Sequence, residues 1–156
     1  MNKIVLFDID YTLFNTDRFR QSNLSDFVLY GEVTQAITQL EKVATLGIFS
    51  EGTLELQNEK LHQTNILPHF IEEHIHIVAK KEEGLKTVLH KYRNYKIFLI
   101  DDKLTILQKA KNILPELITI WIKRGKYALT QDSIAGFVPW ATVDNLSDII
   151  ELIAKD

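Results

Sequence analysis

The chain opens with MNKIVLFDIDYTLF (residues 1–14), in which four apolar residues, Ile4 to Phe7, run directly into Asp8 and Asp10. A short, continuous apolar run is typical of a strand that is buried on both faces of a parallel sheet. Two carboxylates at the end of such a strand would repel each other unless a cation lay between them. The stretch therefore predicts a buried first strand that ends in a functional site.

Outward from this stretch, short apolar runs alternate with segments of helical periodicity. Further strands are expected at residues 47–49, 75–78, 96–100 and 117–122, and helices at 32–44, 53–63, 82–92, 104–114 and 145–154. Strands that alternate with helices predict a parallel sheet with helices on both faces. We therefore expect an α/β fold with a Rossmann-like parallel sheet of about five strands.

Length and composition narrow the class of protein. A chain of 156 residues is expected to form one domain, residues 1–156, with a substantial core. The net charge of −3 gives no electrostatic reason to expect nucleic acid or an anionic membrane as partner. The absence of cysteine excludes disulfides, thiolate metal sites and a catalytic thiol. No apolar run approaches a membrane span or a secretion signal, so a cytoplasmic location is expected.

A second acid pair repeats the pattern of the first strand. Asp101 and Asp102 directly follow the apolar run at 96–100. The carboxyl ends of parallel strands meet at one edge of a sheet, so these carboxylates are expected beside Asp8 and Asp10. A ligand set of oxygen atoms, with no nearby His or Cys, favours a hard cation, Mg²⁺ before Ca²⁺ or Zn²⁺.

Two other strand ends carry polar residues suited to an anion. Ser50 follows the second expected strand and precedes Glu51, Gly52 and a helix, and such a junction offers a hydroxyl group and free backbone N–H groups. Lys80 and Lys81 follow the third expected strand, where an ammonium group could offset the carboxylates and bind a phosphate oxygen. Which lysine faces the site is open, and proximity to the strand end favours Lys80.

Two further features have simpler interpretations. His74 and His76 have the spacing of a metal-binding pair on a strand, but no third ligand follows, and packing at a strand edge is favoured. The basic run Lys123 to Lys126 is interpreted as a solvated loop, with substrate-anion binding as the alternative.

Together, the motifs resemble those of the haloacid dehalogenase-like (HAD) hydrolase superfamily. They are, in order, FDIDYTLF (7–14), IFSEG (48–52), a Lys before a helix, and FLIDD (98–102). WIKRG (121–125) and DNLSDIIELI (144–153) resemble the fifth strand and last helix of the family, so the resemblance spans nearly the whole chain.

The resemblance implies a role for each motif residue. Asp8 would be the nucleophile that forms an aspartyl-phosphate, and Asp10 would be the general acid and then the general base. Thr12 would order the turn, and Ser50 with Glu51 and Gly52 would bind the phosphoryl group. Lys80 or Lys81 would stabilise the charge of that group. Asp8, the Asp10 carbonyl and Asp102 would bind Mg²⁺, with Asp101 as a neighbouring acid.

The implied function is a Mg²⁺-dependent phosphatase that hydrolyses phosphate monoesters. Asp10 favours a phosphatase over a dehalogenase, which does not need this acid. Two departures from the family pattern are Tyr11, where Gly is frequent, and Ile106, where a second acid is frequent. The alternatives are a HAD-fold binding or regulatory protein with weakened catalysis and a receiver-type phospho-acceptor domain. The order of the motifs argues against the receiver domain, because its phospho-accepting Asp follows a middle strand.

The intervals between the motifs are too short for a full cap domain. Residues 15–30 could form only a short helical lid, with Arg18, Phe19, Arg20 and Phe27 over the site. An open site suits a bulky phosphorylated substrate or needs a second subunit to close it. The expected partner is a phosphorylated substrate, either a small molecule or a bulky one. The expected state is therefore a monomer or a homodimer.

Overall fold

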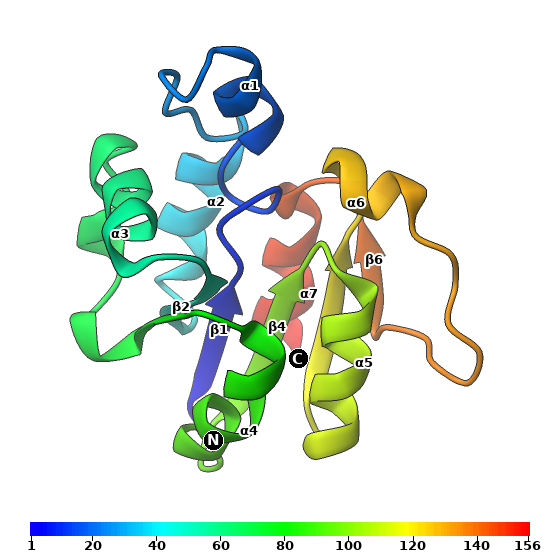
Figure 1. The fold of residues 1–156 in the computed structure, drawn as a ribbon. Coiled ribbons are helices and arrows are strands. Elements are labelled where there is room, and N and C mark those ends of the chain that lie inside the picture. The colour runs from blue at the N-terminus through cyan, green and yellow to red at the C-terminus, as the bar shows by residue number, and fades with distance from the viewer.

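The computed structural model describes residues 1–156 and is built around one parallel sheet (Figure 1). The strand order is β3-β2-β1-β4-β5-β6, and every neighbouring pair is parallel. The expected α/β architecture is confirmed, with six strands rather than about five. The strands are β1 (Lys3–Phe7), β2 (Thr45–Glu51), β3 (Ile75–Val78), β4 (Lys96–Asp101), β5 (Ile118–Ile122) and β6 (Ala141–Val143).

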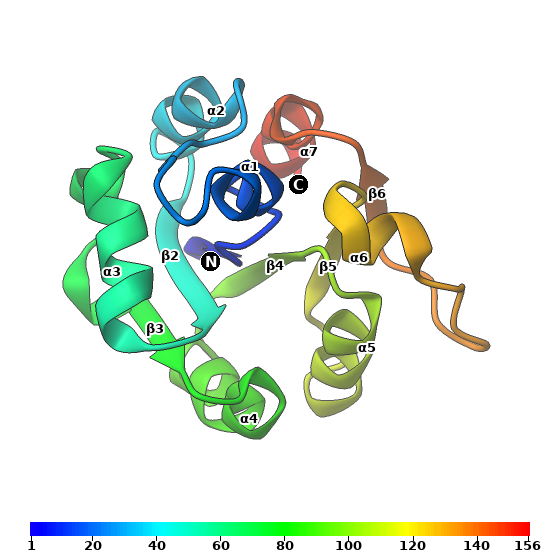
Figure 2. The same ribbon diagram turned by 45° about the horizontal axis from the view of Figure 1, so that its top comes forward.

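Helices cover both faces of the sheet, as Figures 1 and 2 show. They are α1 (Thr16–Gln21), α2 (Val33–Leu40), α3 (Leu54–Gln63), α4 (Lys81–Lys91), α5 (Leu104–Ile113), α6 (Gly125–Thr130) and α7 (Ile149–Lys155). Short 3₁₀ turns lie at η1 (Leu67–His69), η2 (Glu72–His74) and η3 (Leu146–Asp148). No helix combines the length and the apolar composition needed to cross a membrane.

Successive side chains of β1 point alternately into two separate core clusters. Val5 and Phe7 belong to a cluster with buried side chains of α2, α3 and α7, whereas Ile4 and Leu6 belong to a cluster with those of α4 and α5. Successive side chains of a strand point to opposite faces, so a continuous apolar run is needed where both faces are covered. This packing explains why the central strands could be read from the sequence.

The structure differs from expectation where elements are short. Strand β6 has three residues, pairs only with β5 and is partly exposed, so it has no continuous apolar run. Helix α6 has six residues and one buried residue, Ala128. The helix expected at 32–44 ends at Leu40, and residues 41–43 form a turn.

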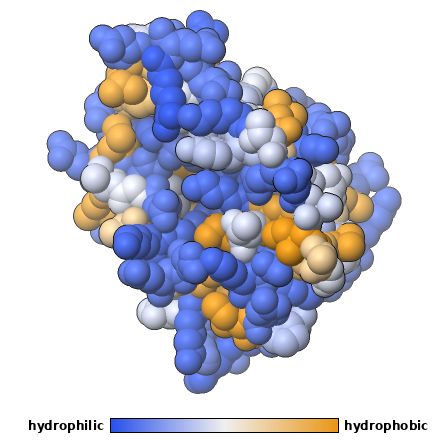
Figure 3. All heavy atoms as spheres, turned by 45° about the vertical axis from the view of Figure 1, so that its right-hand side comes forward, coloured by the Kyte–Doolittle hydropathy of each residue, from blue (hydrophilic) through white to orange (hydrophobic).

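The face on the β6 side of the molecule is mainly hydrophilic, with hydrophobic side chains in small, separate groups (Figure 3). The large hydrophobic residues most exposed near α6 and β6 are Leu129, Val138 and Trp140. Surface apolar residues in small groups are ordinary for a globular protein.

The register of β1 against β4 brings the two acid pairs together. Phe7 is paired with Ile100, and the next backbone N–H, that of Asp8, donates to the Ile100 carbonyl at 3.0 Å. Asp8 and Asp101 therefore leave the sheet side by side. The sequence prediction that distant strands deliver carboxylates to one edge is confirmed.

The segment after β1 rises above this edge and leads into α1 (Figure 1). Three aromatic rings pack edge to face beneath it, with centroids 5.2 Å apart for Phe14 and Phe19 and 4.9 Å apart for Phe19 and Phe27. These rings join the larger core cluster that includes Val5 and Phe7, and Phe19, Arg20 and Leu24 line the cavity.

Candidate active site

A cavity of about 350 Å³ lies at the carboxyl ends of β1 and β4. Its walls come from seven parts of the chain: the β1 end, residues 15–30, the β2 end, α3, the start of α4, the β4 end with α5, and α6. The lining residues used below are Asp8, Asp10, Arg20, Glu51, Lys60, Lys81, Asp101, Asp102, Lys103, Ile106 and Tyr127.

Three carboxylates form the floor of the cavity. One oxygen each from Asp8, Asp101 and Asp102 lie within 4.8 Å of one another, and all three residues are buried. Burial raises the pKa of Asp102, and the negative charges of Asp8 and Asp101 raise it further. Burial also raises the pKa of Asp8, although the Lys81 ammonium opposes this. Three ionised carboxylates would therefore place more negative charge here than the single Lys81 ammonium compensates.

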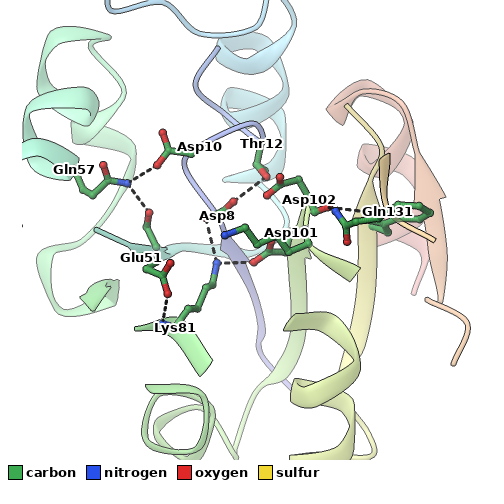
Figure 4. A network of polar contacts seen from close by, with 12 residues as sticks. Asp8, Asp10, Thr12, Glu51, Gln57, Lys81, Asp101, Asp102 and Gln131 are labelled. Atoms are coloured by element: carbon green, nitrogen blue, oxygen red, sulfur yellow. Dashed lines mark hydrogen bonds and ion pairs between the residues drawn. The ribbon is translucent and has the colours of Figure 1, made fainter. Parts of the chain in front are cut away.

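Lys81, not Lys80, is the lysine of this cluster (Figure 4). The Lys81 Nζ lies 2.6 Å from Asp101 Oδ2 and 3.2 Å from Asp8 Oδ1. The Lys80 side chain is 73% exposed and is 4.0 Å from Glu83. The preference for Lys80 is therefore corrected: Lys80 is the extended residue before α4, and the first residue of the helix turns inward.

The loop after β4 is held by contacts that the sequence did not reveal. The backbone N–H of Lys103 donates to Asp101 Oδ1 at 2.8 Å. The main-chain carbonyl of Asp102 accepts from Trp121 Nε1 at 3.0 Å and from Gln131 Nε2 at 2.8 Å. These bonds fix the backbone of Asp102 while its Oδ2 has no partner.

Asp10 stands apart from the other three carboxylates. Its Oδ1 is 2.7 Å from Lys60 Nζ and accepts from Thr16 Oγ1 at 2.9 Å. Its Oδ2 accepts from Gln57 Nε2 at 3.0 Å (Figure 4). The structure thus brings Asp10 to the cavity, but with α3 rather than with the carboxylate cluster.

The residues expected to bind a phosphoryl group have different positions. Ser50 is fully buried and does not line the cavity, because Gln57 covers it and donates from Nε2 to Ser50 Oγ at 2.8 Å. Glu51 lines the cavity and accepts from the backbone N–H of Lys81 at 2.8 Å. Gly52 does not line it. Thr12 is buried, and its Oγ1 reaches Asp8 Oδ2 at 3.5 Å.

The two other patterns noted in the sequence serve packing. His74 Nδ1 and His76 Nε2 lie 3.0 and 2.6 Å from the hydroxyl oxygen of Tyr92. Arg124 is not part of a solvated loop: its guanidinium pairs with Glu32 at 2.8 Å and donates to the Thr12 carbonyl. Arg124 therefore supports the turn that follows Asp8.

The residues at the two departures from the family pattern also lie at the cavity. Tyr11 has a positive φ of 62°, a conformation that favours glycine, and its ring lies edge to face with Tyr127 at 5.4 Å. Ile106 is 8% exposed and lines the wall on the α5 side. This wall of the cavity therefore has an apolar side chain at the position where a second acid is frequent in the family.

The carboxylate cluster fits a metal ion. All its donors are oxygen atoms, one of them, Asp102 Oδ2, is buried without a partner, and the surrounding charge is negative. A cation would satisfy that oxygen and relieve the repulsion among the three carboxylates. Oxygen-only ligands suit a hard divalent cation.

Gln57 and Lys60 are the site residues that the sequence motifs missed. Both lie on α3 and are buried with Leu61 on the same helix. The signal was present, because Gln57 is one turn before the apolar Leu61 and Lys60 is its neighbour. Two long polar side chains on the buried face of a helix indicate partners in the interior.

Solved structures of HAD-type hydrolases superpose on nearly the whole chain. A protein from Burkholderia xenovorans LB400, assigned as a haloacid dehalogenase-like hydrolase, has a TM-score of 0.79 and 20% identity over 99% of this chain and 98% of its own. YfnB from Bacillus subtilis, assigned as a HAD-hydrolase and bound to magnesium, has a TM-score of 0.77 and 12% identity over 97% and 98%.

A 2-haloacid dehalogenase from Pseudomonas syringae pv. Tomato DC3000 has a TM-score of 0.70 and 15% identity over 99% of both chains. No protein-family model matches the chain, and no curated protein sequence matches it. The chain therefore has the haloacid dehalogenase-like fold, which confirms at the level of the fold the resemblance seen in its motifs.

Proposed function

We propose that this protein is a Mg²⁺-dependent phosphatase that hydrolyses phosphate monoesters through an aspartyl-phosphate on Asp8. The observation that carries the proposal is the buried arrangement of Asp8 between the Lys81 ammonium and the Asp102 carboxylate, at a cavity that Asp10 also lines. The solved structures that share this fold support a hydrolase. That the substrate is a phosphate ester is inferred from the residues of this chain.

In the first step, an Asp8 oxygen attacks phosphorus while the bond from phosphorus to the ester oxygen breaks. Asp10 gives a proton to the departing oxygen, which leaves as an alcohol. In the second step, Asp10 takes a proton from water, the water oxygen bonds to phosphorus, and the bond to Asp8 breaks. Inorganic phosphate leaves, and both carboxylates return to their starting states.

The other residues act on charge and position. The Lys81 ammonium lies against Asp8 and is placed to stabilise negative charge on the transferring group. Asp8, Asp102 and the main-chain carbonyl of Asp10 would hold Mg²⁺, and Asp101 orients Lys81. Bound Mg²⁺ would supply a Lewis acid that neutralises charge on the phosphoryl oxygens. Ser50, Glu51, Gly52 and Thr12 are proposed to support the phosphoryl site, Ser50 through Gln57.

The rim of the cavity favours an anionic substrate. Arg20 and Lys103 line it, and neither side chain forms an ion pair. Lys103 Nζ lies 5.1 Å from the ring centroid of Tyr127, which lines the same rim. Cations near the mouth of a cavity attract a phosphate ester before it reaches the buried carboxylates.

The first experiment measures hydrolysis of p-nitrophenyl phosphate with Mg²⁺ and with EDTA, for the native chain and Asp8→Asn. We expect EDTA to stop turnover and Asp8→Asn to lower it at least roughly a thousandfold, since the nucleophile is removed. Asp148→Asn, an exposed acid beside α7, is the matched control and should keep native activity. An active Asp8→Asn protein would exclude the covalent mechanism.

Two further measurements separate the alternatives. Halide release from 2-chloropropionate without phosphate-ester turnover would identify a dehalogenase. Mg²⁺ binding by calorimetry, lost in Asp102→Asn but accompanied by no turnover of any ester tested, would identify a binding protein with weakened catalysis.

A further inference from the structure

We propose that Gln57 and Lys60, about one turn apart on α3, are positioning residues that fix the Asp10 carboxylate for proton transfer. The inference rests on the proposed phosphatase function, in which Asp10 exchanges the proton. It assigns a role to a helix that contributes none of the sequence motifs.

The two side chains hold different oxygens of the same carboxylate. Lys60 Nζ is 2.7 Å from Asp10 Oδ1, and Gln57 Nε2 is 3.0 Å from Asp10 Oδ2. Two donors at opposite ends of a carboxylate oppose its rotation. Since Oδ1 also accepts from Thr16, Oδ2 is the oxygen with fewer donors, and the geometry points to Oδ2 as the atom that exchanges a proton with the substrate.

The arrangement depends on burial. Lys60 is 5% exposed and Gln57 is 1% exposed, whereas the Asp10 side chain is 27% exposed and lines the cavity. The donors are therefore sheltered from solvent, and the acceptor is the group open to a ligand. The Lys60 ammonium also lies 5.1 Å from the Phe14 ring centroid and 5.6 Å from that of Phe19, so two aromatic rings help to shelter it.

Gly52 makes room for the amide. A Cβ atom at Gly52 would lie 2.9 Å from Cγ of Gln57, so a larger residue there would displace Gln57. From its position Gln57 Nε2 reaches both Asp10 Oδ2 and Ser50 Oγ. The strand-end residues Ser50 and Gly52 thus help to place Gln57.

Stability alone is a weak explanation for this cluster. A buried ion pair loses hydration on folding, and well-packed apolar side chains of similar volume often replace such a pair without loss of stability. Proton transfer requires the acid to lie within hydrogen-bond reach of the reacting atom. Holding Asp10 in one position at the cavity is therefore a function that the two buried donors can have.

The test uses two esters that differ in leaving group. p-Nitrophenolate leaves readily without a proton, whereas phenolate depends more on protonation. We measure kcat/KM for p-nitrophenyl phosphate and phenyl phosphate, because this ratio reports steps up to the first bond cleavage. Lys60→Met and Gln57→Leu are each expected to lower kcat/KM roughly 10–100-fold for phenyl phosphate but less than about threefold for p-nitrophenyl phosphate.

Three variants exclude a general effect on folding. Lys60→Arg keeps a donor and should recover part of the lost activity on phenyl phosphate. Glu59→Gln changes an exposed neighbour on α3 and should leave both values as in the native enzyme. In the Asp10→Asn background, Lys60→Met should cause no further loss, since the group that it positions is gone. Equal losses on both esters, or a full further loss in Asp10→Asn, would overturn the proposal.

A second readout keeps the test independent of turnover. If the native chain hydrolyses neither ester, the proposed function fails, and the positioning contact is then tested by urea unfolding of Lys60→Met, Asp10→Asn and the double variant. Shifts of the unfolding midpoint that are clearly less than additive would support the contact. Additive shifts would show that Lys60 does not hold Asp10, whatever the protein does.

Discussion

Lys81 is the residue on which the balance of charge in the cluster depends. Burial by itself lowers the pKa of this ammonium, but the carboxylates of Asp101 and Asp8 outweigh burial and raise the pKa above its usual value. The side chain is 4% exposed, so solvent screens these contacts little. Lys81 is therefore charged at neutral pH.

Replacing Lys81 tests this balance directly. We expect Lys81→Met to lower kcat for p-nitrophenyl phosphate by about 10²–10³-fold, the loss typical when one group that stabilises transition-state charge is removed. We also expect the free energy of unfolding to fall by about 3–5 kcal/mol, because two buried carboxylates lose their partner. Turnover and urea unfolding measure the two effects.

The neighbouring lysine is a matched control for this variant. Lys80→Met removes the same charge one residue away, from an exposed side chain, and should change activity less than twofold and stability by less than about 0.5 kcal/mol. A large loss of activity in Lys80→Met would contradict the assignment of Lys81 to the site.

Lys80 and Lys81 also show which part of the site could not be predicted from the sequence. Asp8, Asp10, Asp101 and Asp102 could be predicted because each follows a continuous apolar strand. The choice between two adjacent lysines depends on the residue at which α4 begins, and there the direction of the side chain reverses. Lys80 has extended backbone angles, φ −135° and ψ 111°, and Lys81 is the first helical residue. Proximity in sequence to the strand end was the wrong criterion.

At the scale of elements, predictability follows burial. Strands β1 and β4 are covered on both faces and were read correctly, whereas β6 and α6 bury too little to leave a pattern. Both missed elements nonetheless matter for the site. Tyr127 of α6 lines the cavity, and Gln131, the residue after α6, holds the backbone of Asp102.

The junction of β5 and α6 gives a stability prediction. Gly125 has φ of 79°, and a Cβ atom there would clash with Cδ1 of Tyr11. We expect Gly125→Ala to lower the free energy of unfolding by about 1 kcal/mol from the positive φ and by about 1–3 kcal/mol more from the forced displacement of Tyr11. Urea unfolding at neutral pH measures the sum.

Gly136 separates the two contributions. Its φ is 77°, nearly that of Gly125, but a Cβ atom there would meet nothing within 4 Å. Gly136→Ala should therefore show only the effect of the backbone angle. Equal destabilisation by the two substitutions would mean that Tyr11 yields to the new methyl group and does not fix α6.

At the scale of the whole molecule, the sheet separates two kinds of ionisable groups. The carboxylates lie at the carboxyl ends of β1 and β4, whereas His74 and His76 lie at the β3 edge, against Tyr92 after α4. Burial, together with the nearby charge of Lys91, lowers the pKa of His76 to about 4. Burial also lowers the pKa of His74, although Glu73 opposes this. Both rings are therefore packed in their neutral form.

The lowered pKa of His76 predicts acid sensitivity of the whole fold. Between its unfolded value of 6.5 and its folded value of about 4, the unfolded chain binds a proton that the folded chain does not. The free energy of unfolding must then fall as the pH falls through this window. Urea unfolding of the native chain and His76→Gln from pH 7.5 to pH 4 measures the effect.

The native chain should lose more stability than His76→Gln, so the difference between their free energies of unfolding should move in favour of the variant as the pH falls. His90→Gln, which removes an exposed ring from α4, is the matched control. A constant difference for His76→Gln would instead mean that the folded protein accepts a charged ring beside Tyr92.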